Sequence, residues 1–203
     1  MKVVIRADSS VRMGTGHVMR CLSLAEAIRK RGARVQFICR EFSGHMGEQI
    51  ILAGHELVLL PINDEQLPEN RLGVAWQRDA KEVIEVINDC MPDWLIVDHY
   101  GIDYRWHRQV RSGVRKLMVI DDLANRQLDC DLLLDQSYYT DLAGRYAGLV
   151  PDGCEKLLGP GYMLLRDEFL DTVRRRCSSR GWVERIVVFL GGSDPANGTR
   201  RVI

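Results

Sequence analysis

The sequence predicts an α/β protein built on a Rossmann-like parallel sheet with helices on both faces. Short β-branched runs alternate with segments of helical spacing along most of the chain. The composition is that of an ordinary globular protein, with 46% hydrophobic and 28% charged residues among 203. Because strand–helix–strand units return the chain in the same direction, the alternation favours a parallel sheet covered on both sides.

The first third of the chain is expected to form three strands and two helices. Residues 2–8 (KVVIRAD) and 34–40 (RVQFICR) are rich in β-branched and apolar side chains, as strands are. Between them, residues 17–31 place apolar side chains on one helical face, and Gly32 closes that helix. The other elements expected here are a short helix and a third strand, at residues 43–53 and 55–61.

The middle of the chain continues the same alternation. A polar stretch at 63–72 is expected to be a loop, and a long helix of apolar spacing at 76–91 ends at Pro92. The run DWLIVDHY at 93–100 is a strong signal for a fourth strand. A short helix and two more strands are expected at residues 104–112, 116–122 and 130–136.

The last part of the chain is expected to leave the sheet. Residues 137–163 are rich in glycine, proline and tyrosine and are predicted to be irregular, and residues 165–176 are predicted to form a helix. Residues 185–203 show a new strand, glycine loop and helix. We therefore expect an N-terminal Rossmann-like domain at 1–180 and the start of a second one, not continued, at 181–203.

Acidic residues follow three predicted strands. Asp8 ends the first strand, Asp98 the fourth, and Asp121 and Asp122 the fifth. In open parallel sheets, ligands bind outside the carboxyl ends of the strands, so these side chains are expected along one ligand-binding edge. The alternative, that each acid caps a helix or holds a loop, remains open for every one of them.

The turn between the first strand and the first helix contains Gly14, Gly16 and then His17. Glycines allow a close approach of backbone and ligand, and a helix N-terminus favours an anion. A dinucleotide fingerprint needs a third glycine where Met19 stands, and no P-loop lysine is present, so NAD and P-loop binding of ATP are disfavoured. His17 is the side chain of this turn that can exchange a proton near neutral pH. A plain tight turn and a structural histidine are the alternatives.

The other histidines are weaker candidates. His99 stands at a strand end and is placed to line the cleft. His107 is expected on an exposed helix face, while His45 and His55 are expected in a peripheral helix and at a strand start.

Composition and motifs exclude several functions. The 28 basic and 28 acidic residues balance, so neither nucleic acid nor a membrane surface is an expected partner. No apolar run reaches the ~20 residues of a membrane span, and no signal peptide is evident, so a cytoplasmic location is expected. No metal-binding spacing appears, and no metal or cofactor is expected. The scattered cysteines are expected to be reduced thiols: Cys21, Cys39, Cys90, Cys130, Cys154 and Cys177.

Segments spread over nearly the whole chain resemble a known family. They are RADSSVRMGTGHVMRCLSLA, IVDHYGID, VIDDLANR, CDLLLDQ, LLGPGYMLLRDEF and VVFLGGSDPAN. Together, in this order, they resemble the UDP-sugar hydrolases of pseudaminic acid biosynthesis, the PseG family. The resemblance implies a bacterial enzyme of the MurG-like GT-B fold, with two Rossmann-like domains and the active site between them.

The resemblance also implies a reaction and a set of site residues. Water attacks the anomeric carbon of UDP-2,4-diacetamido-2,4,6-trideoxy-β-L-altropyranose with inversion, UDP leaves, and His17 is the general base. Gly14 and Gly16 give room for the sugar and phosphate, and Arg6, Asp8 and Tyr100 lie on motifs around the cleft. The loop expected to face the diphosphate consists of Gly191, Gly192, Ser193 and Asp194. Because the family's second domain supplies most of the uridine pocket, residues 1–203 alone are expected to hydrolyse the substrate poorly.

Two other functions remain open at this point. A GT-B glycosyltransferase would use the same base on a sugar hydroxyl instead of water, since fold does not fix function. A non-catalytic domain that binds a nucleotide sugar is the second. Release of UDP without any acceptor would separate the hydrolase from both.

Overall fold

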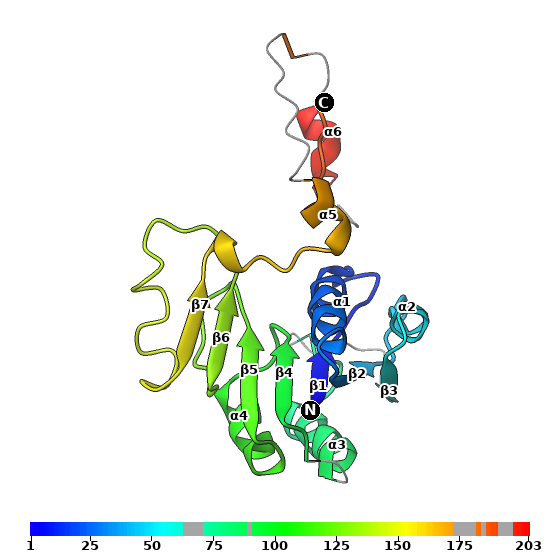
Figure 1. The fold of residues 1–203 in the computed structure, drawn as a ribbon, viewed down its shortest axis with the longest axis vertical. Helices are drawn as coiled ribbons and strands as arrows, with labels where there is room; N and C mark the ends of the chain where they lie inside the picture. Colours follow the sequence, from blue (N-terminus) through cyan, green and yellow to red (C-terminus); the bar gives the residue numbers. More distant parts are fainter. Residues whose placement is uncertain (63–70, 89–90, 173–181, 184–185, 191–196) are drawn as a thin grey trace.

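The computed structural model describes most of the chain. The described residues are 1–62, 71–88, 91–172, 182–183, 186–190 and 197–203. They contain a seven-stranded sheet of order β3-β2-β1-β4-β5-β6-β7 in which every neighbouring pair is parallel. The arrows in Figure 1 therefore point to one common edge, and the predicted Rossmann-like class is confirmed.

The bounds of the elements follow the predicted alternation closely. The strands are β1 (Lys2–Ala7), β2 (Arg34–Arg40), β3 (Glu56–Leu60), β4 (Trp94–Asp98), β5 (Lys116–Ile120), β6 (Leu132–Asp135) and β7 (Glu155–Leu158). The helices are α1 (Gly16–Arg29), α2 (Gly47–Leu52), α3 (Trp76–Asn88), α4 (Tyr104–Val110), α5 (Asp167–Thr172) and α6 (Gly198–Val202). Short 3₁₀ turns at Arg111–Gly113 and Pro160–Tyr162 complete the list. No helix of the described residues is long and apolar enough to cross a membrane.

Two hydrophobic cores lie on opposite faces of the sheet. One packs α3 and α4 against alternate strand residues that include Val4 and Val97. The other packs α1 and α2 against the intervening residues, such as Ile5 and Ile96. Figure 1 shows α1 on one side of the sheet and α3 and α4 on the other. Because side chains alternate along a strand, each face of the sheet receives every second residue.

Two predictions about the C-terminal part are wrong. Residues 137–163 were expected to be irregular, yet β7 at Glu155–Leu158 pairs with β6. This edge strand is only four residues long and half exposed, so it lacks the apolar alternation that marks an inner strand. A strand was expected from residue 185, but residues 186–190 form none, and Ile186, Val187 and Phe189 are exposed. A β-branched run becomes a strand only where a neighbouring strand offers backbone partners.

Other predictions in this part are confirmed or lie outside the described residues. Helix α5 lies within the expected range of 165–176, whose last residues are not described. The glycine loop formed by Gly191, Gly192, Ser193 and Asp194 also lies outside the described residues. Figure 1 shows α5 and α6 beyond the edge at which the strands end. The described cysteines are buried free thiols, as expected: Cys21, Cys39, Cys130 and Cys154.

The expected exposure of His107 is also wrong. His107 is fully buried in α4, between the sheet and the segment that leads into β6. Its Nδ1 accepts a hydrogen bond of 3.2 Å from the Asp129 backbone N–H. Helix α4 is short and buries Trp106 and Val110 beside it, so the buried face extends further round the helix than the spacing indicated.

Candidate active site

The turn before α1 is shaped by its glycines. Gly14 adopts a φ of 77°, and its N–H donates to the Ser10 carbonyl at 2.8 Å, which closes a tight turn. An L-residue is strained at that φ, so Gly14 is required by backbone geometry. Gly16 begins α1, and a Cβ placed on it would meet no atom within 4 Å. Gly16 therefore leaves open space beside His17.

His17 lies in the first turn of α1 and meets the end of β4. Its Nδ1 lies 2.7 Å from Asp98 Oδ1, and only 11% of the His17 side chain is exposed. Among the described residues, no group hydrogen-bonds His17 Nε2. If Asp98 is ionised, it can only accept, so the ring hydrogen belongs on Nδ1 and Nε2 carries a lone pair. A histidine held in this way can take a proton at Nε2.

Arg20 joins this pair to a second acid. Its Nε and Nη2 donate to the two oxygens of Asp98, each at 2.5 Å, and its Nη1 donates to Asp122 Oδ2 at 3.2 Å. The Tyr100 hydroxyl donates to the other oxygen of Asp122 at 2.7 Å. The Tyr100 ring then packs edge-on against the His17 ring, with centroids 4.5 Å apart. These five side chains, those of His17, Asp98, Arg20, Asp122 and Tyr100, form a closed chain of contacts, which we call the His17 cluster.

Nη2 of Arg20 also lies 3.3 Å from His17 Nδ1, but this contact is not a second hydrogen bond to a lone pair. Burial works to raise the pKa of Asp98, yet the hydrogen bonds from Arg20 and His17 outweigh it, so its pKa lies below the ordinary value. Asp98 is thus a carboxylate, and the shorter contact fixes the hydrogen of Nδ1 toward it. Burial and the bond to Asp122 raise the pKa of Tyr100, which stays a hydroxyl donor.

Arg6 and Asp8 lie on the other side of the sheet from His17. Both are fully buried, and Arg6 Nη1 donates to Asp8 Oδ1 at 2.5 Å. Nη2 of Arg6 pairs with Asp79 of α3 at 2.7 Å, and Arg40 pairs with the same oxygen at 2.6 Å. Burial raises the pKa of Asp8, but the Arg6 charge and its other partners outweigh this and hold it well below the ordinary value. Arg6 and Asp8, both predicted as site residues, have no exposed surface. They belong to a buried ion-pair network that holds β1 in place.

Two further residues of the predicted edge also turn inward. Asp121 is 1% exposed and accepts hydrogen bonds from Arg126 at 2.8 Å and from Tyr146 at 3.0 Å. His99 is 3% exposed, and its Nδ1 accepts from the Gly101 N–H at 3.0 Å. For Asp8 and Asp121, the alternative interpretation as structural acids is therefore favoured. Of the expected acids, Asp98 contacts His17 directly, and Asp122 is linked to His17 through Arg20 and Tyr100.

Sequence reasoning missed two residues of these clusters. Arg20 carried a signal, because it stands three residues after His17 and so lies on the same face of a helix. Asp79 carried one too, since it sits within the apolar spacing of Trp76, Ala80 and Val83 and is buried with the last two. A charged residue on the buried face of a helix needs a partner in the sheet, which here is Arg6.

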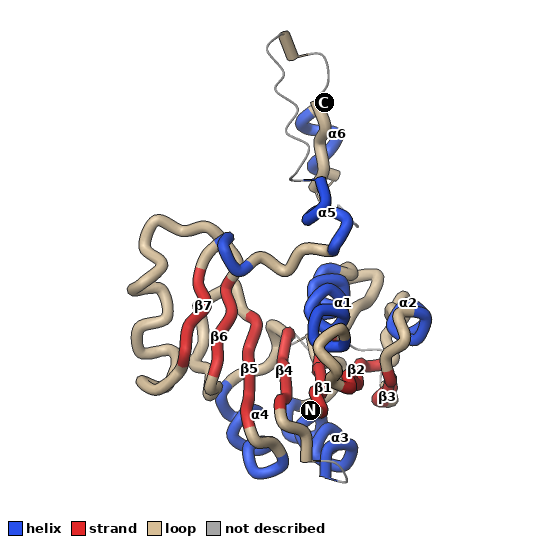
Figure 2. The backbone as a smooth tube through the Cα atoms, in the orientation of Figure 1, coloured by secondary structure: helices blue, strands red, loops and turns tan. Residues whose placement is uncertain are grey.

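A hollow of about 220 Å³ opens beside this site. It is lined on one side by α1, through Gly16, Met19 and Arg20, and on the other by Leu165 and Phe169. A second hollow of about 250 Å³, against α4, is lined by none of the residues of the His17 cluster. Figure 2 shows that the loops drawn in tan after β1, β4 and β5 begin at one edge of the sheet. The His17 cluster lies at this edge. Within the described ranges, no group of three or more His, Cys, Asp or Glu is placed to hold a metal ion.

Comparison with curated proteins bears out the resemblance seen in the motifs. The chain is 30% identical over 97% of its length to UDP-2,4-diacetamido-2,4,6-trideoxy-β-L-altropyranose hydrolase of Campylobacter jejuni. The similarity therefore extends over nearly all residues of the present chain. It spans 62% of the hydrolase's length, and 39% of an uncharacterised protein of Methanocaldococcus jannaschii to which it is 28% identical. No family model matches the chain.

Comparison with solved structures supports the fold. MurG of Acinetobacter baumannii matches with a TM-score of 0.51 at 11% identity, over 78% of this chain and 45% of that one. UGT89C1 of Arabidopsis thaliana, in complex with UDP-L-rhamnose, matches with a TM-score of 0.55 at 12% identity, over 88% of this chain and 56% of that one. At such identities the likeness speaks for the fold alone, and it agrees with the predicted GT-B type.

Proposed function

We propose that this chain supplies the general base of a UDP-sugar hydrolase, and that His17 is that base. The observation that carries the proposal is the His17–Asp98 pair, 2.7 Å apart, at the carboxyl edge of the sheet with Nε2 unpaired among the described residues. The similarity to the Campylobacter hydrolase supports a substrate of the same class, a UDP-linked diacetamido-trideoxyhexose. The reaction belongs to the biosynthesis of a surface sugar such as pseudaminic acid.

The reaction is an inverting displacement at the anomeric carbon. A water oxygen forms a bond to C1 while the bond between C1 and the diphosphate oxygen breaks, so UDP leaves with the electron pair. The water proton passes to His17 Nε2, and Asp98 stabilises the imidazolium that forms. UDP is a good leaving group, so hydrogen-bond donors and helix dipoles can stabilise the negative charge that develops on its diphosphate.

The start of α1 supports an anionic substrate group. Its N-cap residue, Thr15, makes no side-chain capping bond, and its first turn contains no acid. The N–H groups there are therefore available to a phosphate, which a helix N-terminus favours. The hollow between Arg20 and Phe169 is lined by Gly16, the first residue of α1, and so lies next to these N–H groups. The role of Tyr100 in binding, and that of the loop of Gly191, Gly192, Ser193 and Asp194 in holding the diphosphate, stay predictions.

Substitution of His17 tests the proposal on the full-length protein. His17→Asn is expected to lower kcat by roughly 10²–10⁴-fold with little change in KM, because a base acts in the chemical step and hardly in ground-state binding. Attack at carbon predicts that oxygen from labelled water appears on the released sugar and not on UDP. Near-normal turnover by the variant, or label in the UDP, would remove this role from His17.

The same assay separates hydrolysis from transfer. A glycosyltransferase would release UDP only when a sugar acceptor is present, whereas the proposed hydrolase releases it in water alone. A purely binding domain would bind the UDP-sugar and leave it intact under both conditions.

A further inference from the structure

Arg20 occupies a position from which it controls the chemistry of His17 without touching the reacting atoms. It reaches both oxygens of Asp98 from one side, while His17 Nδ1 reaches Oδ1 from the other. Only 12% of the Arg20 side chain is exposed, and Asp98 is fully buried. A fork of two N–H donors fits a carboxylate closely and holds its plane in one orientation.

The tautomer of His17 depends on the state of this carboxylate. An ionised Asp98 accepts only, so it draws the ring hydrogen to Nδ1 and leaves Nε2 bare. A buried carboxyl without a cation tends to bind a proton, because burial disfavours its charged form. A protonated Asp98 would donate to Nδ1, the ring hydrogen would move to Nε2, and His17 would no longer accept a proton there.

We propose that Arg20 is a positioning residue that sets the tautomer of His17 by clamping Asp98 as an oriented carboxylate. The bond to Asp122 anchors the far side of the guanidinium, and Tyr100, which donates to Asp122, packs on the His17 ring. The clamp is thereby fixed at two carboxylates at the ends of two neighbouring strands, Asp98 in β4 and Asp122 just after β5. This inference rests on the proposed role of His17 as a base, but the tautomer can be measured without substrate.

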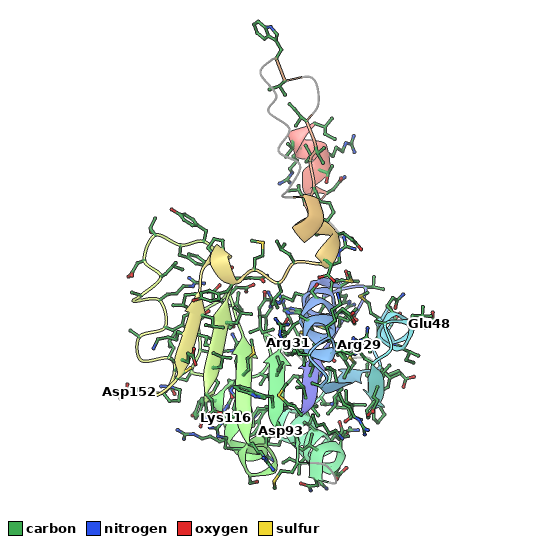
Figure 3. All side chains as sticks on the ribbon, in the orientation of Figure 1. Arg29, Arg31, Glu48, Asp93, Lys116 and Asp152 are labelled. Carbon is green, nitrogen blue, oxygen red and sulfur yellow. The ribbon has the colours of Figure 1, made fainter. Side chains whose placement is uncertain are left out.

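The experiment is nitrogen-15 NMR of the His17 imidazole, which shows which ring nitrogen bears the hydrogen. Spectra are compared for wild type, Arg20→Met and Arg20→Lys, at a pH well above the ordinary histidine pKa of about 6.5. His17→Asn identifies the signals of residue 17. Arg29→Met is the matched control, because Arg29 is half exposed at the other end of α1, where Figure 3 labels it, and pairs with Glu26.

We expect the hydrogen on Nδ1 in wild type and Arg29→Met, and a clear shift toward Nε2 in Arg20→Met. Arg20→Lys keeps the charge but loses the fork, so it should lie between them. In the full-length enzyme, Arg20→Met should lower kcat by roughly 10–100-fold, the usual cost of losing such a support, with KM nearly unchanged.

An unchanged His17 tautomer in folded Arg20→Met overturns the inference. If Arg20→Met does not fold, an unchanged tautomer in Arg20→Lys does so instead. A shifted tautomer in a protein that releases no UDP keeps the role of Arg20 and removes the proposed function. An unshifted tautomer together with UDP release that depends on His17 keeps the function and removes Arg20.

Discussion

Replacing Asp79 tests the buried ion-pair network that lies across the sheet from His17. Asp79 Oδ2 accepts from Arg6 at 2.7 Å and from Arg40 at 2.6 Å, and Oδ1 accepts from Trp106 Nε1 at 2.9 Å. The change Asp79→Asn keeps the size of the side chain, removes its charge and turns one acceptor into a donor that faces arginine. Two buried guanidinium groups then lose a shared carboxylate.

The magnitude follows from what remains of the network. Removing one partner of a buried ion pair costs about 3–5 kcal/mol. Arg6 would keep Asp8 at 2.5 Å, and Arg40 would keep Glu82 at 2.7 Å. Because neither arginine is left without a carboxylate, we expect the free energy of unfolding to fall by about 3 kcal/mol, the lower end of that range. A domain stable by about 5–15 kcal/mol remains folded after such a loss.

The assay is urea unfolding followed by tryptophan fluorescence, with Trp106 beside the altered residue as a reporter. The matched control is Glu48→Gln, which removes a charge from an exposed position of α2 labelled in Figure 3. It should change the free energy of unfolding by less than about 0.5 kcal/mol. A loss below about 1 kcal/mol in Asp79→Asn would refute the view that this carboxylate holds the two arginines.

Three more outcomes test other parts of the structure. Burial, with the Arg126 charge, lowers the pKa of His107 to about 3, so between pH 6.5 and 3 the unfolded chain binds a proton that the folded chain does not. The free energy of unfolding should therefore drop by about 1–2 kcal/mol from pH 7 to pH 5, and His107→Gln should remove most of that drop. Gly14→Ala should cost about 1–2 kcal/mol because of its positive φ, whereas Gly16→Ala should stay within about 0.5 kcal/mol in the same urea titration. Tyr100→Phe, which leaves one oxygen of Asp122 without its donor, should lower kcat by roughly 10-fold while KM stays within about twofold, and unchanged kinetics would exclude a role for that hydroxyl.

The sheet was predictable because its strands carry strong apolar runs and its helices a clear period. The weak edge strand β7 and the exposed run at 186–190 were not, because the first is stabilised by β6 and the second meets no strand among the described residues. Local spacing measures the preference of a segment, whereas pairing depends on neighbours far along the chain. The burial of His107 was missed for the same reason, since the segment around Asp129 that covers it lies 22 residues away.

Sequence reasoning placed the candidate site at this edge of the sheet, with His17 in it, but it did not separate the roles of the four acids. Strand alternation separates them. Ile96 and Ile120 belong to the core under α1. Asp98 and Asp122 each come two residues later in the chain, so their side chains fall on the same side of the sheet as α1 and His17. The remaining acid pair follows the opposite parity.

Asp8 continues the parity of Val4, and Asp121 that of Val119, both in the core under α3 and α4. These two acids therefore meet partners on that face, Arg6 for Asp8 and Tyr146 for Asp121. One period of two residues thus divides a row of carboxylates at a single edge into a pair that orders His17 and a pair that holds the sheet. It follows that charge-removing changes at Asp98 and Asp122 should appear first in kcat, and those at Asp8 and Asp121 first in the free energy of unfolding.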